Sequence, residues 1–315
     1  MTSLAAAEHF AGAPEWTWYI LGYFFLAGIA GGCYFLAVFL RHWGNPADEP
    51  VARLGFYAAL PPILIAPILL TLDLTKPLRF WHMLVNTTPD EFGLNFNSGT
   101  PMSVGVWGLV VASVFALVSF LDTLVRDGKL RNPLARRLSA LLEGGAGKVW
   151  DVAGAAVFLF IAAYTGVLLA VSNQPIWSDT WALGGLFLAS GLSGSAALLL
   201  LLTRYRRGAE ASRGFLELSE RLFAALELLL LAVLVLTLIA DGTLDEAFDL
   251  PWIPLWLVAL AGMLPGLRGL AANRLSVTAG GTLAVERTQA LTVAPALVLA
   301  GVLALRAAVI FSAQA

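Results

Sequence analysis

The sequence predicts an all-α, polytopic membrane protein with eight transmembrane helices arranged as two four-helix bundles. The first observation behind this prediction is composition: 59% of the 315 residues are hydrophobic and only 13% are charged. The second is a series of long apolar runs, each near the roughly 20 residues that a helix needs to cross a bilayer. The third is that no run shows the period of two of a transmembrane β-strand. Helices satisfy their own backbone groups inside lipid, so they are the expected form.

The expected spans follow one another along the whole chain. The seventh is short and lies among three prolines, Pro251, Pro254 and Pro265. The eight spans are Trp18–Leu40, Leu54–Leu72, Met102–Leu124, Val149–Ser172, Trp181–Thr203, Leu222–Ala240, Trp252–Leu264 and Ala290–Phe311.

An internal likeness indicates two related halves. Phe25-Leu-Ala-Gly-Ile-Ala-Gly-Gly32 and Phe187-Leu-Ala-Ser-Gly-Leu-Ser-Gly194 look alike, as in a parallel repeat of four helices. Coincidence between two apolar helices explains the likeness equally well. By its connections the chain divides into 1–148, with the tail, three helices and a basic loop, and 149–315, with helices four to eight. By function it divides into 14–172, the half expected to carry the binding site, and 181–315.

Basic residues mark the expected orientation. Connections 126–148 and 204–221 hold most of the Lys and Arg, whereas 173–180 has none and 241–251 has only acids. Because Lys and Arg collect in cytoplasmic loops, we expect both termini on the extracytoplasmic side. The tail up to Glu15 lacks the basic region of a cleaved signal peptide, so we expect the first run to be a retained helix.

Composition also excludes several classes of protein. Cys33 is the single cysteine, so an iron–sulfur cluster or an internal disulfide cannot form within this sequence. His9, His42 and His82 fall in the tail and near the membrane surfaces, so we expect no haem and no metal. A net charge of −2 argues against nucleic-acid partners. Any redox metal centre is therefore expected in another protein.

Charged residues at membrane depth are candidates for function, because they normally face the bundle interior with a partner. Asp73 closes the second span, and Arg306 lies in the outer half of the eighth. Arg306 could act at the site or only hold Asp73 or Asp241. Nearer the cytoplasm, Asp151 opens the fourth span and Glu227 lies inside the sixth. We expect these two acids to form a proton path or structural pairs.

Several stretches resemble the NrfD/PsrC family, the membrane subunits of polysulfide-reductase-type complexes, over nearly the full length of the chain. The Asp-to-His run and the Met-Ser-x-Gly-x-Trp run are the specific ones. The stretches are Pro14-Glu-Trp-Thr-Trp18, Phe25–Gly32, Leu72-Asp-Leu-Thr-Lys-Pro-Leu-Arg-Phe-Trp-His82, Pro101-Met-Ser-Val-Gly-Val-Trp107, Tyr164-Thr-Gly-Val-Leu and Leu299–Arg306.

The resemblance implies a haem-free subunit of a bacterial or archaeal cytoplasmic membrane that binds a quinone, menaquinone or ubiquinone, near the outer surface. It also implies two soluble partners, a four-cluster iron–sulfur protein and a molybdopterin-type catalytic subunit. Loops 75–100 and 173–180 are the expected docking surface for the first partner. The terminal substrate and the direction of electron flow are not specified by this sequence.

Site residues follow from the same resemblance. Tyr164 matches a tyrosine that contacts the quinone, and Asp73 matches an acid on the second helix. The family's histidine and asparagine on the first helix align near Tyr23 and Ile20, so this sequence departs there. We expect catalytic roles for Asp73 and His82 and quinone contacts from four side chains: Tyr164, Asp73, Tyr23 and Arg79.

Two other classes fit parts of the pattern. A secondary transporter of a small anion would also show internal repeats, intramembrane charges and Gly-interrupted helices, and it would act without partners. A non-catalytic membrane anchor would keep the fold with a degenerate quinone site. Insensitivity of quinol-dependent activity to Tyr164→Phe would favour that class.

Overall fold

The computed structural model describes residues 15–88, 92–272 and 284–314, and the side-chain surroundings of residues 269–292 are outside the description. Two short strands, β1 (Val85–Asn86) and β2 (Gly93–Leu94), form an antiparallel hairpin. The 3₁₀ helices are η1 (Pro46–Asp48), η2 (Pro77–Met83), η3 (Thr203–Tyr205) and η4 (Ala209–Ser212). The α-helices are α1 (Trp18–Trp43), α2 (Glu49–Leu72), α3 (Pro101–Arg126), α4 (Pro133–Leu141), α5 (Gly144–Ala170), α6 (Leu183–Leu202), α7 (Arg213–Asp241), α8 (Leu244–Ala247), α9 (Ile253–Ala272) and α10 (Ala284–Ser312).

These elements confirm an all-α polytopic membrane protein. Among the described residues, seven helices are long and apolar enough to cross a membrane, and Ile253–Arg268 is a shorter apolar helix. The expected seventh span, Trp252–Leu264, falls in that shorter helix and is not one of the seven. The tail through Pro14, with His9, lies outside the described residues, and only the backbone is described for the first residues of the expected eighth span.

Several helices begin earlier than predicted, and in two of them charged residues continue the helix beyond the apolar run. The second was expected from Leu54, but α2 begins at Glu49, whose carboxylate accepts from Arg53 one turn later at 2.9 Å. The sixth was expected from Leu222, but α7 begins at Arg213 and carries a Glu217–Arg221 pair at 3.7 Å. Pairs at this spacing stabilise a helical turn in water, where hydropathy gives no signal.

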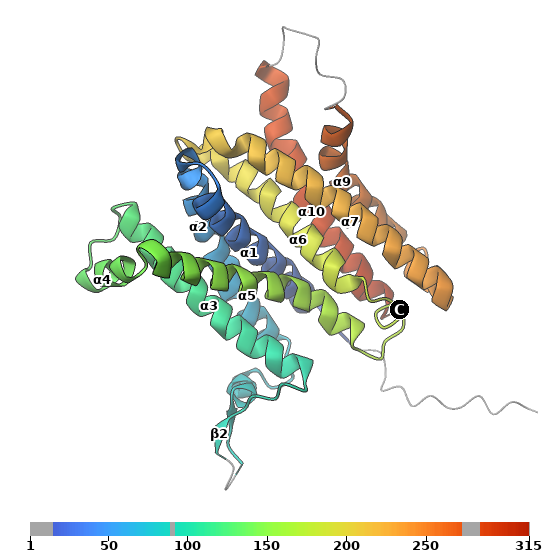
Figure 1. Ribbon diagram of the computed structural model, residues 1–315. Coiled ribbons are helices and arrows are strands. Elements are labelled where there is room, and N and C mark those ends of the chain that lie inside the picture. Colours follow the sequence, from blue (N-terminus) through green and yellow to red (C-terminus); the bar gives the residue numbers. More distant parts are fainter. Residues whose placement is uncertain (1–14, 89–91, 273–283, 315) are drawn as a thin grey trace, which may run out of the picture.

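The long helices contact one another in two cyclic sets, α1, α2, α3 and α5, and then α6, α7, α9 and α10. Helices α1 and α6 lie side by side where the two sets meet (Figure 1). Their contact is close because glycines face each other: a Cβ placed on Gly191 would lie 3.0 Å from the carbonyl oxygen of Gly28. The Ser195 hydroxyl also donates to the Ile29 carbonyl across this contact at 2.9 Å. The two stretches that look alike in sequence therefore pack against each other.

The helix ends form two faces with different chemistry. At the terminal face, the backbone N–H of Trp16 donates to the Gln314 side chain at 2.6 Å, so both ends of the described chain lie together. At the opposite, basic face, Asp127 accepts from Arg53 and Arg206, each at 2.7 Å. These three residues join the turns after α3 and α6 to the start of α2. The terminal face is the one that holds Trp16 and Gln314, and the basic face is the one that holds Arg53, Asp127 and Arg206.

Candidate functional site

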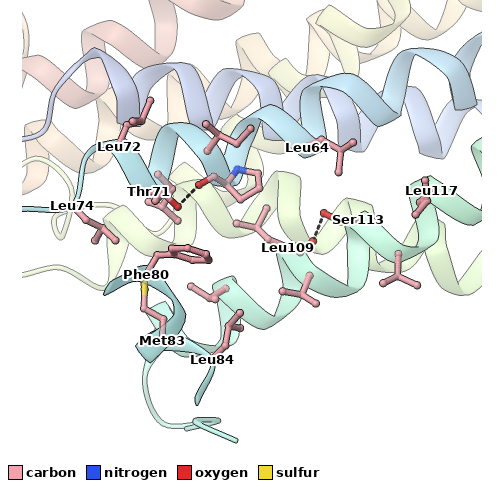
Figure 2. Close-up of a pocket in the computed structure, with 16 residues that line it drawn as sticks. Leu64, Thr71, Leu72, Leu74, Phe80, Met83, Leu84, Leu109, Ser113 and Leu117 are labelled. Carbon is pink, nitrogen blue, oxygen red and sulfur yellow. Dashed lines mark hydrogen bonds between the residues drawn. The ribbon is translucent and has the colours of Figure 1, made fainter. Parts of the chain in front are cut away.

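An apolar groove lies between α2 and α3 at the terminal face (Figure 2). Its volume is about 570 Å³. The C-terminal half of α2 and the N-terminal half of α3 form its walls, and residues in and beside η2 close one end. It is lined by Leu64, Pro67, Ile68, Leu70, Thr71, Leu72, Leu74, Phe80, Met83, Leu84, Val106, Leu109, Val110, Ser113, Val114 and Leu117.

The groove opens toward the surface that a bilayer would cover. Ile68, Leu72 and Val114 are each more than half exposed, and exposed apolar side chains in such number mark a contact with lipid or with a ligand. Both hydroxyl protons in the lining are already used, by Thr71 toward the Pro67 carbonyl and by Ser113 toward the Leu109 carbonyl, at 2.8 Å each. The interior is therefore suited to an apolar tail or ring rather than to a charged molecule.

The short helix η2 places Arg79 and His82, two of the predicted site residues, at the closed end of the groove. Phe80 and Met83 line the groove, as Figure 2 shows, while Arg79 is exposed and His82 is half-buried. The His82 ring stacks on Trp81 with 3.8 Å between ring centroids. The backbone carbonyl of His82 accepts from the Asn95 side chain at 2.9 Å, which fixes η2 against the segment after β2.

Asp73 lies at the rim of the groove. It is the residue after the last turn of α2, between the lining residues Leu72 and Leu74. Its carboxylate accepts a hydrogen bond from the Thr17 hydroxyl at 2.6 Å, across 56 residues of sequence. Thr17 is also the N-cap of α1 and accepts from the Tyr19 backbone N–H at 3.2 Å. One threonine thus fixes the start of α1 to the end of α2 and orients the carboxylate.

Tyr164 and Tyr23 are not in the lining of the groove. The Tyr164 hydroxyl donates to the Pro101 carbonyl, at the start of α3, at 2.7 Å. Its ring packs against α3 and fits only because residue 105 is a glycine, since a Cβ there would overlap the ring. Tyr23 is almost fully buried on α1, where its ring lies 5.2 Å from the Phe24 ring between centroids. The next residue of α3, Val106, lines the groove.

The two candidates for a proton path lie in different surroundings. Asp151 belongs to the basic face, where its carboxylate lies 2.8 Å from His42 Nε2 and 3.5 Å from Arg41. Glu227 is buried on α7. The two acids belong to different helices, and no hydrogen bond among the described residues joins them directly. A proton path through them stays a prediction.

Arg306 does not hold Asp73 or Asp241, and this expectation was wrong. Asp73 is bonded to Thr17, and Asp241 is exposed at the end of α7. The guanidinium of Arg306 is fully buried and donates to the Phe187 carbonyl and the Ser190 hydroxyl of α6, at 2.9 and 2.8 Å. It also donates to the Phe24 carbonyl of α1 at 3.3 Å. Arg306 thus joins α1, α6 and α10 through backbone acceptors, which a sequence does not mark.

Sequence reasoning missed four contributors to this region. Thr17 precedes the first apolar run, as a threonine N-cap typically does, so its capping role was predictable although its bond to Asp73 was not. Gly105 was noticed only as part of a motif. Phe80 and Met83 form the closed end of the groove, and no periodicity marks them.

Comparison with known proteins agrees with this architecture. The family model for "Polysulphide reductase, NrfD" matches residues 7–315. A subunit of the polysulfide reductase of Wolinella succinogenes is 29% identical over 197 residues, which are 59% of this chain and 57% of that protein. Protein NrfD of Escherichia coli is 29% identical over 211 residues, 64% of this chain and 63% of that protein.

A third relative, the protein NrfD homolog of Haemophilus influenzae, is 30% identical over 209 residues, which are 59% of this chain and 58% of that protein. The aligned part thus spans 57–63% of the length of these curated relatives. The family model, in contrast, covers almost every residue described above. The chain therefore belongs to the NrfD family of polysulphide reductase membrane proteins.

Proposed function

We propose that this protein is the quinone- or quinol-binding membrane subunit of a polysulfide-reductase-like oxidoreductase complex. It exchanges electrons between the quinone pool and an extracytoplasmic four-cluster iron–sulfur protein, which in turn serves a molybdopterin-type catalytic subunit. The observation that carries this proposal is the lipid-open apolar groove that ends beside Asp73 and η2. Membership of the NrfD family and similarity to the polysulfide reductase subunit of Wolinella succinogenes support it.

The lining residues fit the apolar part of a quinone. Pockets for small molecules are mostly apolar with a few placed polar groups, and this groove has mainly apolar walls, with two internally bonded hydroxyls in the lining and charged side chains at its rim. Hydrophobic walls exclude water from a bound ring, which strengthens any hydrogen bond made to it. A quinone supplies two-electron, two-proton carrier chemistry when it is bound.

Asp73 and His82 are the proposed proton-handling residues. Asp73 is held by Thr17 at the rim, where one carboxylate oxygen is committed to that bond. His82 is half-buried beside the groove, and an imidazole can both accept and donate a proton in general acid–base chemistry. Arg79 is exposed next to the lining residue Phe80 and supplies positive charge at the closed end of the groove. Tyr164 packs against α3, and Tyr164 and Tyr23 are proposed as donors toward the head group.

The remaining parts of the arrangement follow from the same proposal. The two cyclic sets of helices are inferred to be two four-helix bundles, the first with the quinone site. The terminal face is inferred to be extracytoplasmic, so that loops 75–100 and 173–180 meet the iron–sulfur partner and released protons enter the outer aqueous phase. The basic face then contacts the cytoplasm, as the distribution of Lys and Arg favours.

A groove-filling substitution tests the quinone site directly. Val110 lines the groove and Val111 does not, yet the two are equally exposed neighbours on α3, at 38% and 39%. Val110→Trp should therefore abolish binding of a quinone-site inhibitor to the purified protein, measured by fluorescence quenching. Val111→Trp places the same ring on the lipid-facing surface and should leave the affinity unchanged.

Three results would contradict the proposal in different ways. Equal affinity in wild type and Val110→Trp would remove the groove as the site. Failure of the wild-type protein to bind any quinone analogue, with normal assembly into a complex, would indicate a non-catalytic anchor. Uptake of a small anion by vesicles that contain this protein alone would indicate a transporter.

A further inference from the structure

A second pocket lies at the basic face, far from the groove, between the ends of α1 and α3 and the starts of α2 and α5. Its volume is about 400 Å³, and almost all of its surface is polar. It is lined by Arg41, His42, Glu49, Arg53, Arg126, Leu142, Gly144, Gly147, Lys148 and Asp151. Four of these side chains are permanently cationic and two are anionic.

The two acids that line the pocket already have basic partners. Glu49 accepts from Arg53 at 2.9 Å, and Asp151 lies 2.8 Å from His42 Nε2. Arg126 is paired with Asp122, behind the pocket wall, at 2.8 Å. Lys148, in contrast, has no carboxylate within ion-pair distance among the described residues, and its ammonium lies 5.0 Å from the Trp43 ring centroid.

Arg41 has the most buried side chain of the four cations in the pocket, and its ion pairs with the surrounding carboxylates are long. Its side chain is 9% exposed, and its guanidinium lies 3.4 to 3.5 Å from Glu49, Asp122 and Asp151. Charge-assisted hydrogen bonds are normally 2.7–2.9 Å long. Its Nε has no hydrogen-bond partner among the described residues although it is buried. The surrounding carboxylates therefore satisfy this guanidinium only partly, and a phosphate in the pocket would supply the short charge-assisted bonds that they do not.

The first turn of α5 adds backbone donors to the same pocket. Gly144 and Gly147 line it, and they carry no side chain that would cover the backbone N–H groups. The helix has no side-chain N-cap bond and no acid in its first turn. The free N–H groups and the dipole of such a helix start favour anions, phosphate in particular.

We propose that this pocket binds a phosphate group at the start of α5, between the Arg41 guanidinium and the Lys148 ammonium. The phosphate belongs either to the head group of an anionic phospholipid or to free phosphate from the aqueous phase. The pocket lies at the ends of four helices that are long and apolar enough to cross a membrane, and basic pockets between the ends of such helices recognise lipid head groups. This site is independent of the proposed quinone groove.

Ligand titrations of the full-length protein in an uncharged detergent test the proposal and separate the two sources. The probes are dioleoylphosphatidylglycerol, dioleoylphosphatidylcholine and inorganic phosphate at constant ionic strength. Native mass spectrometry counts the retained lipid, and the apparent Tm reports stabilisation. A saturable effect of phosphatidylglycerol alone supports a lipid head group, whereas the same effect of inorganic phosphate supports free phosphate.

Variants link either effect to this pocket. Lys148 is exposed, so Lys148→Gln should fold normally and bind the active probe about fivefold more weakly, the usual effect of one basic residue beside an anionic group. Lys148→Arg should keep the affinity. Arg137→Gln, on exposed α4 at the same face and outside the pocket, should behave as wild type. The proposal is overturned if no probe binds saturably, or if Lys148→Gln and Arg137→Gln weaken binding equally.

Discussion

The terminal and basic faces lie at opposite ends of the same helices, α2 and α3, and they differ in how those two helices contact each other. At the terminal face, α2 and α3 separate around an apolar groove, and the polar side chains Asp73, Arg79 and His82 stay at its rim. At the basic face, the same two helices are joined by ion pairs around Asp127. The first face leaves apolar surface uncovered, and at the second the carboxylate of Asp127 is fully paired with basic side chains. Binding chemistry and mechanical attachment are thus placed at opposite ends of α2 and α3.

Removing the central acid of the basic face should give the largest change in stability. Asp127 accepts hydrogen bonds from Arg53, Arg206 and Tyr57 at 2.7 to 2.8 Å, and its side chain is only 7% exposed. Asp127→Ala leaves two half-buried arginines without this acceptor. We expect a loss of about 2–4 kcal/mol in the free energy of unfolding, below the value for fully buried pairs. Denaturant titration in detergent measures it.

A neighbouring cation provides the control for that comparison. Lys129 also pairs with Asp127, at 3.5 Å, but its side chain is 59% exposed. Lys129→Ala should therefore cost less than about 1 kcal/mol, as exposed pairs usually do. Equal losses for Asp127→Ala and Lys129→Ala would mean that the network around Asp127 does not hold the helices together.

At the terminal face, the largest expected effect is on turnover and not on stability. Asp73→Asn keeps an oxygen that can accept the Thr17 hydroxyl but cannot exchange protons. Quinone-linked turnover of the assembled complex should fall about 100-fold, the lower range for a lost acid–base group, while the apparent Tm stays close to wild type. Asp249→Asn changes an exposed acid outside the groove and outside the proposed docking loops, one that accepts from the Leu250 backbone N–H at 2.7 Å, and should leave turnover unchanged. Undiminished turnover in Asp73→Asn would exclude Asp73 as the proton carrier.

The two faces also differ in how much of them the sequence predicted. Hydropathy located the helices because burial in lipid acts on every residue of a span. Asp73 and Tyr164 were picked out as polar residues near the expected outer helix ends, and both lie at the terminal face. Their surroundings were not predictable: Thr17 meets Asp73 across 56 residues, and Gly105 makes room for the Tyr164 ring. Such contacts depend on how helices cross, which no local pattern records.

The partners of the buried charged side chains were the least predictable feature of the structure. Arg306 was expected either to act at the site or to hold Asp73 or Asp241, but backbone carbonyls and a serine hydroxyl satisfy it at the crossing of α1, α6 and α10. Asp151 was expected on a proton path or in a structural pair, and its carboxylate lies beside His42, 109 residues away. Backbone acceptors are present at every position, so a sequence cannot show which of them a buried arginine will use.

Tyr164→Phe separates a ligand contact from a structural one at the terminal face. The hydroxyl donates to the Pro101 carbonyl. Loss of this hydrogen bond should lower the free energy of unfolding by about 0.5–1.5 kcal/mol. If Tyr164 serves the quinone head group, inhibitor affinity should fall by up to about tenfold. Tyr34→Phe removes a hydroxyl that bonds Ser119 at 2.8 Å, away from the groove, and should affect stability alone. Unchanged inhibitor affinity in Tyr164→Phe would restrict this tyrosine to supporting α3.

The smallest expected effect is a dependence on pH that belongs to the basic face. Burial raises the pKa of Asp127, but hydrogen bonds from Arg206, Arg53 and Tyr57 outweigh it and hold the pKa well below its usual range. A carboxyl with a depressed folded pKa stabilises the fold fully above its unfolded pKa, about 3.9, and loses this contribution as the pH falls toward the folded value. The difference in apparent Tm between wild type and Asp127→Asn should thus be constant above about pH 5 and narrow by about 2–4 °C below about pH 4. A difference that stays constant down to about pH 3 would show that the shape of Asp127, and not its charge, joins the three helix ends.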